Sequence, residues 1–152
     1  MALKTFVKIS NVTNLSDARY CAGMGVDLIG FSIDPDSDFY VSPEKAVEIA
    51  EWLAGVEFVA EFYGTDVNNL KSRIADYPIS YVEYSRPELT YEILALGYST
   101  IFKVSVPDDF KEPELSETIQ FVGQQVDFVL LQGIGNFEDD GVVAELKRNC
   151  EQ

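Results

Sequence analysis

The sequence of 152 residues contains no histidine and only two cysteines. Without histidine, the chain lacks the side chain most often used as an acid–base group and as a metal ligand near neutral pH. Cys21 and Cys150 are far apart and show no metal-ligand spacing, so the sequence predicts no metal site and gives no sign of a cofactor. Such sparse cysteine usage is typical of a reducing, cytoplasmic setting.

Basic residues are also scarce. Eleven lysines and arginines stand against 26 aspartates and glutamates, which gives a formal net charge of −15. A surface with this excess repels nucleic-acid phosphates and anionic lipids, which argues against both as partners. The apolar runs are no longer than a strand, so no membrane span is expected, and the N-terminus shows no signal-peptide pattern. The length predicts one domain, residues 1–152.

Six short runs rich in valine, isoleucine, phenylalanine and tyrosine alternate with helical patterns along the chain. The predicted strands are Thr5–Ser10, Leu28–Ile33, Glu57–Tyr63, Ile79–Ser85, Thr100–Val106 and Asp127–Gln132. The predicted helices are Ser16–Gly25, Pro43–Ala54, Val67–Asp76, Pro87–Leu96, Glu114–Gln124 and Asp140–Asn149. Ser42 is a typical N-cap, and Pro43 is typical of a first helical turn.

This alternation predicts an α/β fold of six sequential β/α units, with parallel strands joined by right-handed crossovers. Two architectures fit the pattern, namely a β/α barrel and a doubly wound open sheet. A TIM-type barrel typically has eight units and about 250 residues, so six units would form a partial or shortened barrel. Periodicity alone does not separate the two architectures.

The first part of the chain holds three ordered motifs, KISNVTNLSDA at Lys8–Ala18, GVDLIGF at Gly25–Phe31 and PDSDFYVSPEKA at Pro35–Ala46. In order and without a gap, they resemble K-I-C-G-I-T-N-x-x-D-A, G-A-D-x-x-G-F and P-x-S-x-R-Y-V-S-P-E-x-A of the phosphoribosylanthranilate isomerase family. The resemblance implies β/α-barrel ancestry. It also implies an aminoaldose-to-aminoketose isomerisation, which belongs to tryptophan biosynthesis.

The residues that the resemblance implies for catalysis are replaced here. The family's general base, the cysteine of K-I-C-G, corresponds to Ser10, and its general acid, an aspartate closing the sixth strand, corresponds to Gln132. A serine hydroxyl without an activating neighbour is a weak base, and an amide cannot deliver a proton. Phe39 stands at the arginine of R-Y-V-S-P, and Asn11 at the glycine after the cysteine.

The chain is therefore predicted to be a catalytically degenerate relative of the isomerase that acts in small-molecule binding or assembly. The alternative is an active phosphoribosylanthranilate isomerase, or a related sugar-phosphate isomerase, that uses non-standard residues. In the family, glycine-rich loops after later strands hold the substrate phosphate. The short glycine segment Gly133–Asn136 is interpreted here as a flexible strand-to-helix turn instead.

Strand alternation predicts a group of charges on the face that is the barrel interior in the family. If Ser10 and Gln132 point inward, Lys8, Glu61, Glu83 and Lys103 share their face. Two interpretations stay open: a paired, buried ionic network, or a polar pocket for a small-molecule ligand. The candidate pocket residues are Lys8, Asn11, Ser32, Asp34, Glu61, Tyr63, Glu83, Ser85 and Lys103.

The same topology predicts self-association, with a homodimer as the expected partner state. Sequential right-handed crossovers place all helices on one face, so the other face is expected to lack cover. The predicted first and last strands, Thr5–Ser10 and Asp127–Gln132, are apolar edges without the proline or bulge that commonly protects an edge. A two-fold dimer is the commonest solution, and closure of six strands within one chain is the alternative.

Overall fold

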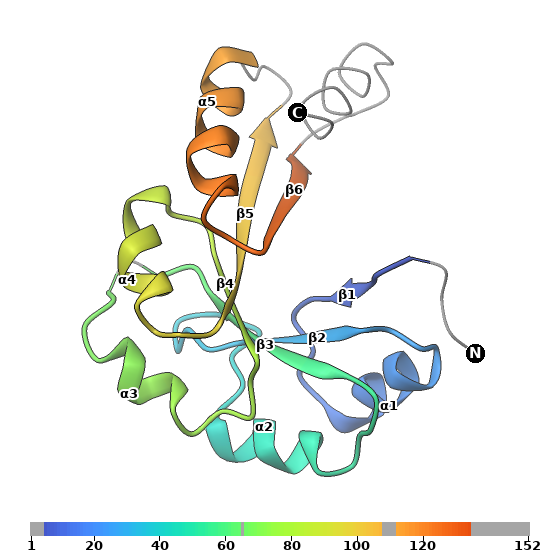
Figure 1. The fold of residues 1–152 in the computed structure, drawn as a ribbon. Coiled ribbons are helices and arrows are strands. Elements are labelled where there is room, and N and C mark those ends of the chain that lie inside the picture. Colours follow the sequence, from blue (N-terminus) through green and yellow to red (C-terminus); the bar gives the residue numbers. More distant parts are fainter. Residues whose placement is uncertain (1–4, 65, 108–111, 135–152) are drawn as a thin grey trace.

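The computed structural model describes residues 5–64, 66–107 and 112–134 of the chain. They form one sheet of six parallel strands in the order β1-β2-β3-β4-β5-β6 (Figure 1). The strands are β1 (Lys8–Ile9), β2 (Leu28–Ser32), β3 (Glu57–Phe62), β4 (Tyr81–Tyr84), β5 (Ser99–Pro107) and β6 (Phe128–Ile134). Between them lie α1 (Leu15–Gly23), α2 (Pro43–Ala50), α3 (Leu70–Ile74), the 3₁₀ turn η1 (Pro87–Leu89), α4 (Thr90–Leu94) and α5 (Glu112–Gly123).

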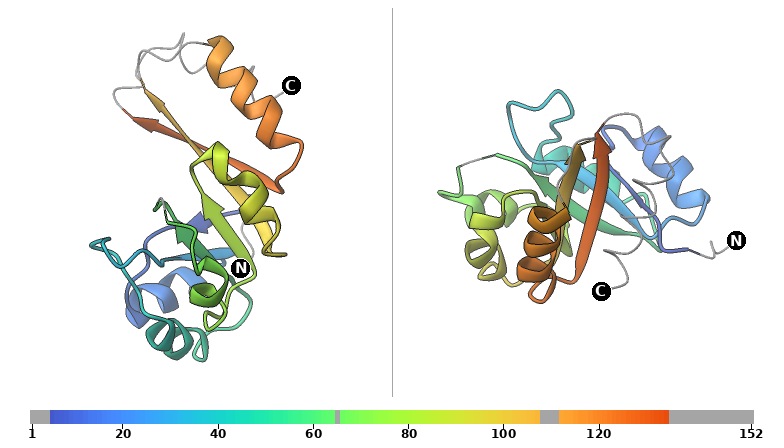
Figure 2. Two further views of the ribbon diagram at one scale, coloured as in Figure 1. Left: turned by 90° about the vertical axis from the view of Figure 1, so that its left-hand side faces the viewer. Right: turned by 90° about the horizontal axis from the view of Figure 1, so that it is seen from above.

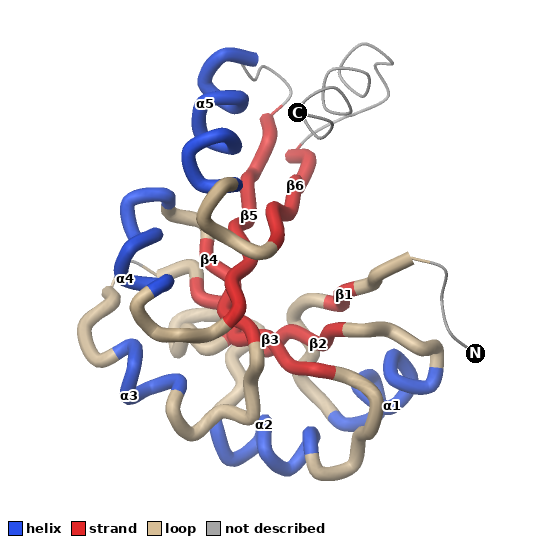
Figure 3. Tube along the Cα trace, viewed as in Figure 1, coloured by secondary structure: helices blue, strands red, loops and turns tan. Residues whose placement is uncertain are grey.

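The sheet curls, and the helices lie along its outer side (Figures 1 and 2). Figure 3 shows the strands as a central band with the helices around it. Strictly sequential order rules out a doubly wound sheet, because that fold needs a point at which the strand order reverses. The prediction of a partial TIM-type (β/α) barrel is therefore confirmed.

Several elements are shorter than predicted, because local backbone conformation overrides the apolar pattern. β1 contains only Lys8 and Ile9, although the Val7 carbonyl still accepts from the backbone of Asp27 and Leu28. α3 begins only after Asn69, whose φ of 60° is left-handed. The predicted helix Pro87–Leu96 starts as the 3₁₀ turn η1 and ends at Leu94.

The predicted turn at Gly133–Asn136 is wrong for its first two residues, which continue β6 in register with β5. Its other two residues, and the predicted helix Asp140–Asn149, lie outside the described residues. Extension of the strand follows from pairing, because Gly133 and Ile134 face Val106 and Pro107.

Two apolar layers lie on the two faces of the sheet. The outer layer packs sheet against helices and includes Phe31, Ile49, Phe62, Ile74 and Phe102, each at most 1% exposed. The inner layer is small and consists of Leu28, Val59 and Ile101, with Tyr81 and Leu130 packed against them.

The expectation of an uncovered inner face is wrong for β2, β3 and the start of β5, where the curl buries it, whereas Phe128 and Gln132 on the same face of β6 are exposed. Leu28, Val59 and Ile101 are 1%, 0% and 3% exposed. Phe6, just before β1, stacks on Phe128 at the start of β6, with ring centroids 5.2 Å apart. The edge strands thus approach each other at their amino ends, while β1 and β6 do not pair within the described sheet. None of the described helices is long and apolar enough to cross a membrane.

Candidate ligand-binding cleft

The sheet register brings two buried carboxylates side by side. Glu61 of β3 lies directly opposite Glu83 of β4, and both side chains are fully buried. Lys8 of β1 supplies the countercharge, since its Nζ lies 2.7 Å from Glu61 Oε2 and 2.7 Å from Glu83 Oε2. Three of the four charges predicted for the inner face therefore form a paired network.

The Glu61 carboxylate is held by backbone as well as by charge. Its Oε1 accepts a 2.8 Å hydrogen bond from the Asn11 backbone N–H, and Asn11 has a φ of 55°. A Cβ built at Gly30 would lie 2.5–2.8 Å from the carboxylate atoms of Glu61. Glycine at position 30 thus makes the space that the buried carboxylate occupies, since such contacts are closer than van der Waals packing allows.

The second oxygen of the Glu83 carboxylate is bound by Tyr63. The Tyr63 hydroxyl donates a hydrogen bond to Glu83 Oε1, whereas Glu83 Oε2 contacts Lys8 without hydrogen-bond geometry from any described residue. Burial raises the pKa of Tyr63, and the charges of Glu83 and Glu61 raise that pKa further. Tyr63 therefore acts as a protonated hydrogen-bond donor at neutral pH.

Lys103 does not join the ion pairs as the sequence suggested. Its Nζ lies over the Tyr63 ring, 4.5 Å from the centroid, and no described carboxylate lies within ion-pair distance of it. The reason is geometric, because Lys103 is one strand further along and two residues beyond Ile101, which is the residue opposite Glu83. Lys103 therefore sits above the Lys8–Glu61–Glu83 cluster, on the aromatic ring that covers Glu83.

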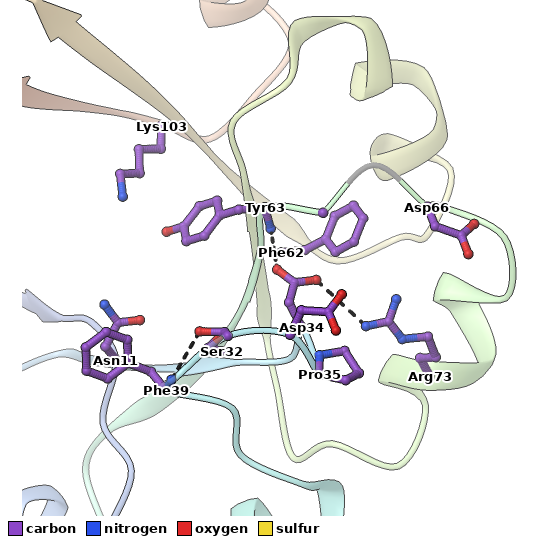
Figure 4. A pocket seen from close by; sticks show the side chains of 13 residues that line it. Asn11, Ser32, Asp34, Pro35, Phe39, Phe62, Tyr63, Asp66, Arg73 and Lys103 are labelled. Atoms are coloured by element: carbon purple, nitrogen blue, oxygen red, sulfur yellow. Dashed lines mark hydrogen bonds and ion pairs between the residues drawn. The ribbon is translucent and has the colours of Figure 1, made fainter.

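A cleft of about 840 Å³ opens beside this cluster, at the carboxyl ends of β2 and β3 (Figure 4). It is lined by Asn11, Ser32, Asp34, Pro35, Asp36, Ser37, Phe39, Phe62, Tyr63, Gly64, Asp66, Arg73 and Lys103. Of the predicted pocket residues, Asn11, Ser32, Asp34, Tyr63 and Lys103 line it. Lys8, Glu61 and Glu83 lie in the adjoining ionic cluster instead, and Ser85, which follows β4, is not part of the lining.

Arg73 is a cleft residue that sequence reasoning missed. From α3, its Nη2 donates to the Ile33 carbonyl at 2.7 Å and lies 3.8 Å from Asp34 Oδ1. Its guanidinium lies 5.9 Å from the centroid of the Phe62 ring. Asp34 in turn accepts from the Tyr63 backbone N–H at 2.7 Å, which ties the ends of β2 and β3 together. No sequence signal marked a residue on a short helix as one that reaches back to a strand end.

Comparison with known proteins shows where this architecture recurs. No protein-family model matches the chain. The N-(5'-phosphoribosyl)anthranilate isomerase of Aquifex aeolicus is 48% identical over 50 residues, which cover 33% of this chain and 24% of that protein. That of Thermotoga maritima is 37% identical over 83 residues, 55% of this chain and 38% of the relative. That of Sulfurovum sp. is 26% identical over 106 residues, 68% and 54% respectively.

Solved structures extend the likeness over nearly the whole chain. A phosphoribosyl anthranilate isomerase in complex with a reduced carboxyphenylamino-deoxyribulose phosphate is 25% identical, with a TM-score of 0.73, over 95% of this chain and 71% of that one. The Thermotoga maritima enzyme gives 26% and 0.70, over 88% and 63%. Over the aligned residues, this chain is similar in sequence and in fold to the phosphoribosylanthranilate isomerase family. It spans about half or less of the length of the curated relatives named above.

The residues predicted to correspond to the isomerase family's base and acid, Ser10 and Gln132, lie at or near strand ends. Ser10 is exposed just after β1, and its Oγ accepts a 2.7 Å hydrogen bond from Lys8 Nζ. Gln132 is exposed on β6, opposite Ser105 of β5. Phe39, which the motif resemblance predicts to stand at the family's arginine, is 49% exposed and lines the cleft. Ser10 and Gln132 lie toward the carboxyl ends of β1 and β6, and Phe39 lies in the loop that follows β2; active sites of barrel enzymes form at this end.

Proposed function

We propose that this chain is a catalytically degenerate relative of phosphoribosylanthranilate isomerase that binds a small molecule in the cleft. The observation that carries the proposal is the contact between Ser10 and Lys8, in which Ser10 Oγ accepts from an ammonium group. The position that resembles the family's base is therefore occupied by a hydroxyl whose nearest charged neighbour is a proton donor.

A base at this position needs a partner that accepts a proton from it. Lys8 cannot take this role while it is ion-paired with both Glu61 and Glu83, since it donates to Ser10 and to Glu61 at the same time. The Glu61 carboxylate, which shares Lys8 with Ser10, is itself engaged with Lys8 and with the Asn11 backbone. The geometry favours a fixed set of ion pairs around Lys8 over an activated base at Ser10.

The acid position supports the same conclusion. The Gln132 amide has no ionisable proton, and no aspartate or glutamate of the described part of β5 and β6 shares its face. Tyr63 is a hydroxyl donor at the cleft, but burial and two carboxylates raise its pKa, which makes it a poor acid near neutral pH. Each proton-transfer group that is lost typically removes about 10²–10⁴-fold in rate.

Steady-state turnover tests this proposal. Purified chain is incubated with N-(5'-phosphoribosyl)anthranilate, and substrate loss is followed beside the Thermotoga maritima enzyme as the active control. We expect a rate that does not exceed the uncatalysed reaction. Turnover within about a hundredfold of the control would contradict the loss of both groups, each of which is worth that much or more.

The second candidate function is an active isomerase that uses non-standard residues. The observation in its favour is the hydrogen bond from Tyr63, a residue of the cleft, to the buried carboxylate of Glu83. If the chain does turn over substrate, Tyr63→Phe should abolish that turnover, because it removes the hydroxyl and leaves the ring. The exposed Tyr20→Phe on α1 is the matched control.

We also propose that residues 1–152 form a single domain that associates as a homodimer. The sheet edges support this, since β1 and β6 each have one neighbouring strand within the described sheet. β6 contains no charged residue and no proline, the features that commonly protect an edge. A Thermotoga maritima phosphoribosylanthranilate isomerase of the same fold is described as dimeric.

A further inference from the structure

We propose that the cleft selects a small, singly charged hydroxycarboxylate over a phosphate ester, with Lys103 as the anchor for the carboxylate. The inference rests on the proposed function, in which the cleft binds a small molecule, and it names the ligand class. It also departs from the relatives, whose name describes a phosphorylated substrate.

Lys103 is the cation that the cleft leaves available. Lys8 is committed to two carboxylates at 2.7 Å, and Arg73 to the Ile33 carbonyl and to Asp34. Lys103 is half-buried on β5, and among the described residues its charge meets only the face of the Tyr63 ring. An ammonium group in this state can pair with an incoming anion without breaking an existing ion pair.

Neutral polar groups also line the cleft. In Figure 4, Lys103 and Asn11 lie on one side of Tyr63, while Asp34, Asp66 and Arg73 lie on the other. Asn11 and Ser32 both line the cleft, so an amide and a hydroxyl belong to the same lining as the proposed anchor. Amide and hydroxyl groups each donate and accept, which suits the hydroxyl groups of a ligand.

The charge of the cleft argues against a phosphate ester. Its lining carries three carboxylates, Asp34, Asp36 and Asp66, and two cations, Arg73 and Lys103, which gives a net charge of −1. The adjoining cluster of Glu61, Glu83 and Lys8 adds another −1. A phosphate monoester carries about 1.5–2 negative charges at neutral pH, so one free ammonium does not balance it. A carboxylate brings only one charge, which pairs one to one with the Lys103 ammonium and adds less negative charge to the cleft than a phosphate ester does.

Three probes that share one carbon skeleton separate the contribution of the carboxylate from that of the phosphate and of the hydroxyl groups. Binding of glycerate, 3-phosphoglycerate and glycerol to the full chain is measured by NMR titration at neutral pH and low ionic strength, where charge selectivity is least screened. We expect glycerate to bind more tightly than both of the others. Lys103→Gln should weaken glycerate binding by about tenfold, the scale of one charge-assisted contact. Lys45→Gln, at a half-exposed lysine on α2 paired with Glu48, should leave it unchanged.

Tighter binding of 3-phosphoglycerate than of glycerate would overturn the inference. So would equal affinities of the wild-type chain and Lys103→Gln for glycerate, or a failure of all three probes to bind. A circular dichroism spectrum of Lys103→Gln that matches the wild type confirms that lost binding is not lost folding. These results are separate from the isomerase assay, because turnover would overturn the proposed function whatever the order of the three affinities.

Discussion

At the scale of single residues, Lys8 determines how two buried acids coexist. Its ammonium contacts Glu61 and Glu83 at 2.7 Å while its own side chain is 10% exposed. Such an arrangement does not by itself indicate a large net stabilisation, because removing charges from water costs free energy that the ion pair only partly offsets. Removal of one partner is costly in different ways: without Lys8 the two carboxylates are left buried and unbalanced, and without Glu61 a buried ion pair and the acceptor of the Asn11 N–H are lost.

We predict that Glu61→Ala lowers the free energy of unfolding by about 3–5 kcal/mol, because it removes one partner of a buried ion pair and a hydrogen-bond acceptor of the Asn11 N–H. Glu48→Ala is the control, since Glu48 pairs with Lys45 at the surface with a 59% exposed side chain. That change should cost at most about 1 kcal/mol. Urea denaturation measures both, and equal losses would show that the cluster is not buried in solution.

At the scale of elements, the packing of β2 against β3 requires that Gly30 has no side chain. A methyl group at this position would lie within 2.5–2.8 Å of the Glu61 carboxylate. We predict that Gly30→Ala lowers the free energy of unfolding by about 1–3 kcal/mol, the usual cost of overpacking. Gly23→Ala at the end of α1 is the control, since a Cβ there meets nothing within 4 Å.

A double mutant tests whether Gly30 is required because of Glu61. In Gly30→Ala combined with Glu61→Ala, the clash is absent, so the combined loss of stability should be smaller than the sum of the two single losses. Additive losses, measured by urea denaturation of all four proteins, would mean that Gly30 is needed for a reason other than the space taken by Glu61.

The sequence predicted correctly which side chains share the inner face of the sheet, because strand alternation alone determines this. Alternation placed Lys8, Glu61 and Glu83 on one face, and the structure joins them. Parity also placed Lys103 on this face, where it lies opposite Leu130, but it could not predict the contact that Lys103 makes, because that contact depends on strand stagger and on the ring of Tyr63. The Ser42 cap of α2 was readable, and its Oγ accepts from the Lys45 N–H at 3.3 Å.

The lengths of α3 and α4 could not be predicted from the sequence. They depend on the left-handed backbone of Asn69 and on the 3₁₀ turn at Pro87, and neither conformation changes the spacing of the apolar residues. Burial of the inner face was missed for a similar reason. It depends on how strongly the sheet curls and on the contact between Phe6 and Phe128, which are far apart in sequence. Long-range closure of this kind is set by twist and packing rather than by local propensity.

At the scale of the whole molecule, buried tyrosines predict sensitivity to alkali. Burial is the largest cause that raises the pKa above the ordinary 10.0 for Tyr63, Tyr77, Tyr81 and Tyr84. Above about pH 10 the unfolded chain loses these protons and the folded chain retains them, so stability falls as pH rises. Below that pH their contribution is fully present.

We therefore predict that the urea midpoint of the wild-type chain drops steeply above about pH 10. Tyr63→Phe should lessen this slope, because it removes the tyrosine placed beside two carboxylates. Tyr20→Phe, at a 71% exposed side chain, should not change it. A slope that is identical for wild type and Tyr63→Phe would show that Tyr63 is not held in its protonated form by the fold.

The open edges of the sheet lead to the prediction of a homodimer. Light scattering coupled to gel filtration should give twice the 17.0 kDa mass of the chain at micromolar protein and moderate salt. Moderate salt is needed because a net charge of −15 repels a second copy at low ionic strength. A mass of 17.0 kDa over a wide concentration range would instead favour a monomer whose curl alone protects its edges.

A single-turnover experiment tests whether the chain has lost the isomerase reaction. Chain in large excess over N-(5'-phosphoribosyl)anthranilate is mixed rapidly, and substrate fluorescence is followed, so that slow product release cannot hide chemistry on the protein. With Ser10 hydrogen-bonded to Lys8 and an amide at Gln132, we predict that the signal decays at the rate measured without protein. A faster decay that rises with protein concentration and yields the aminoketose product would contradict the account.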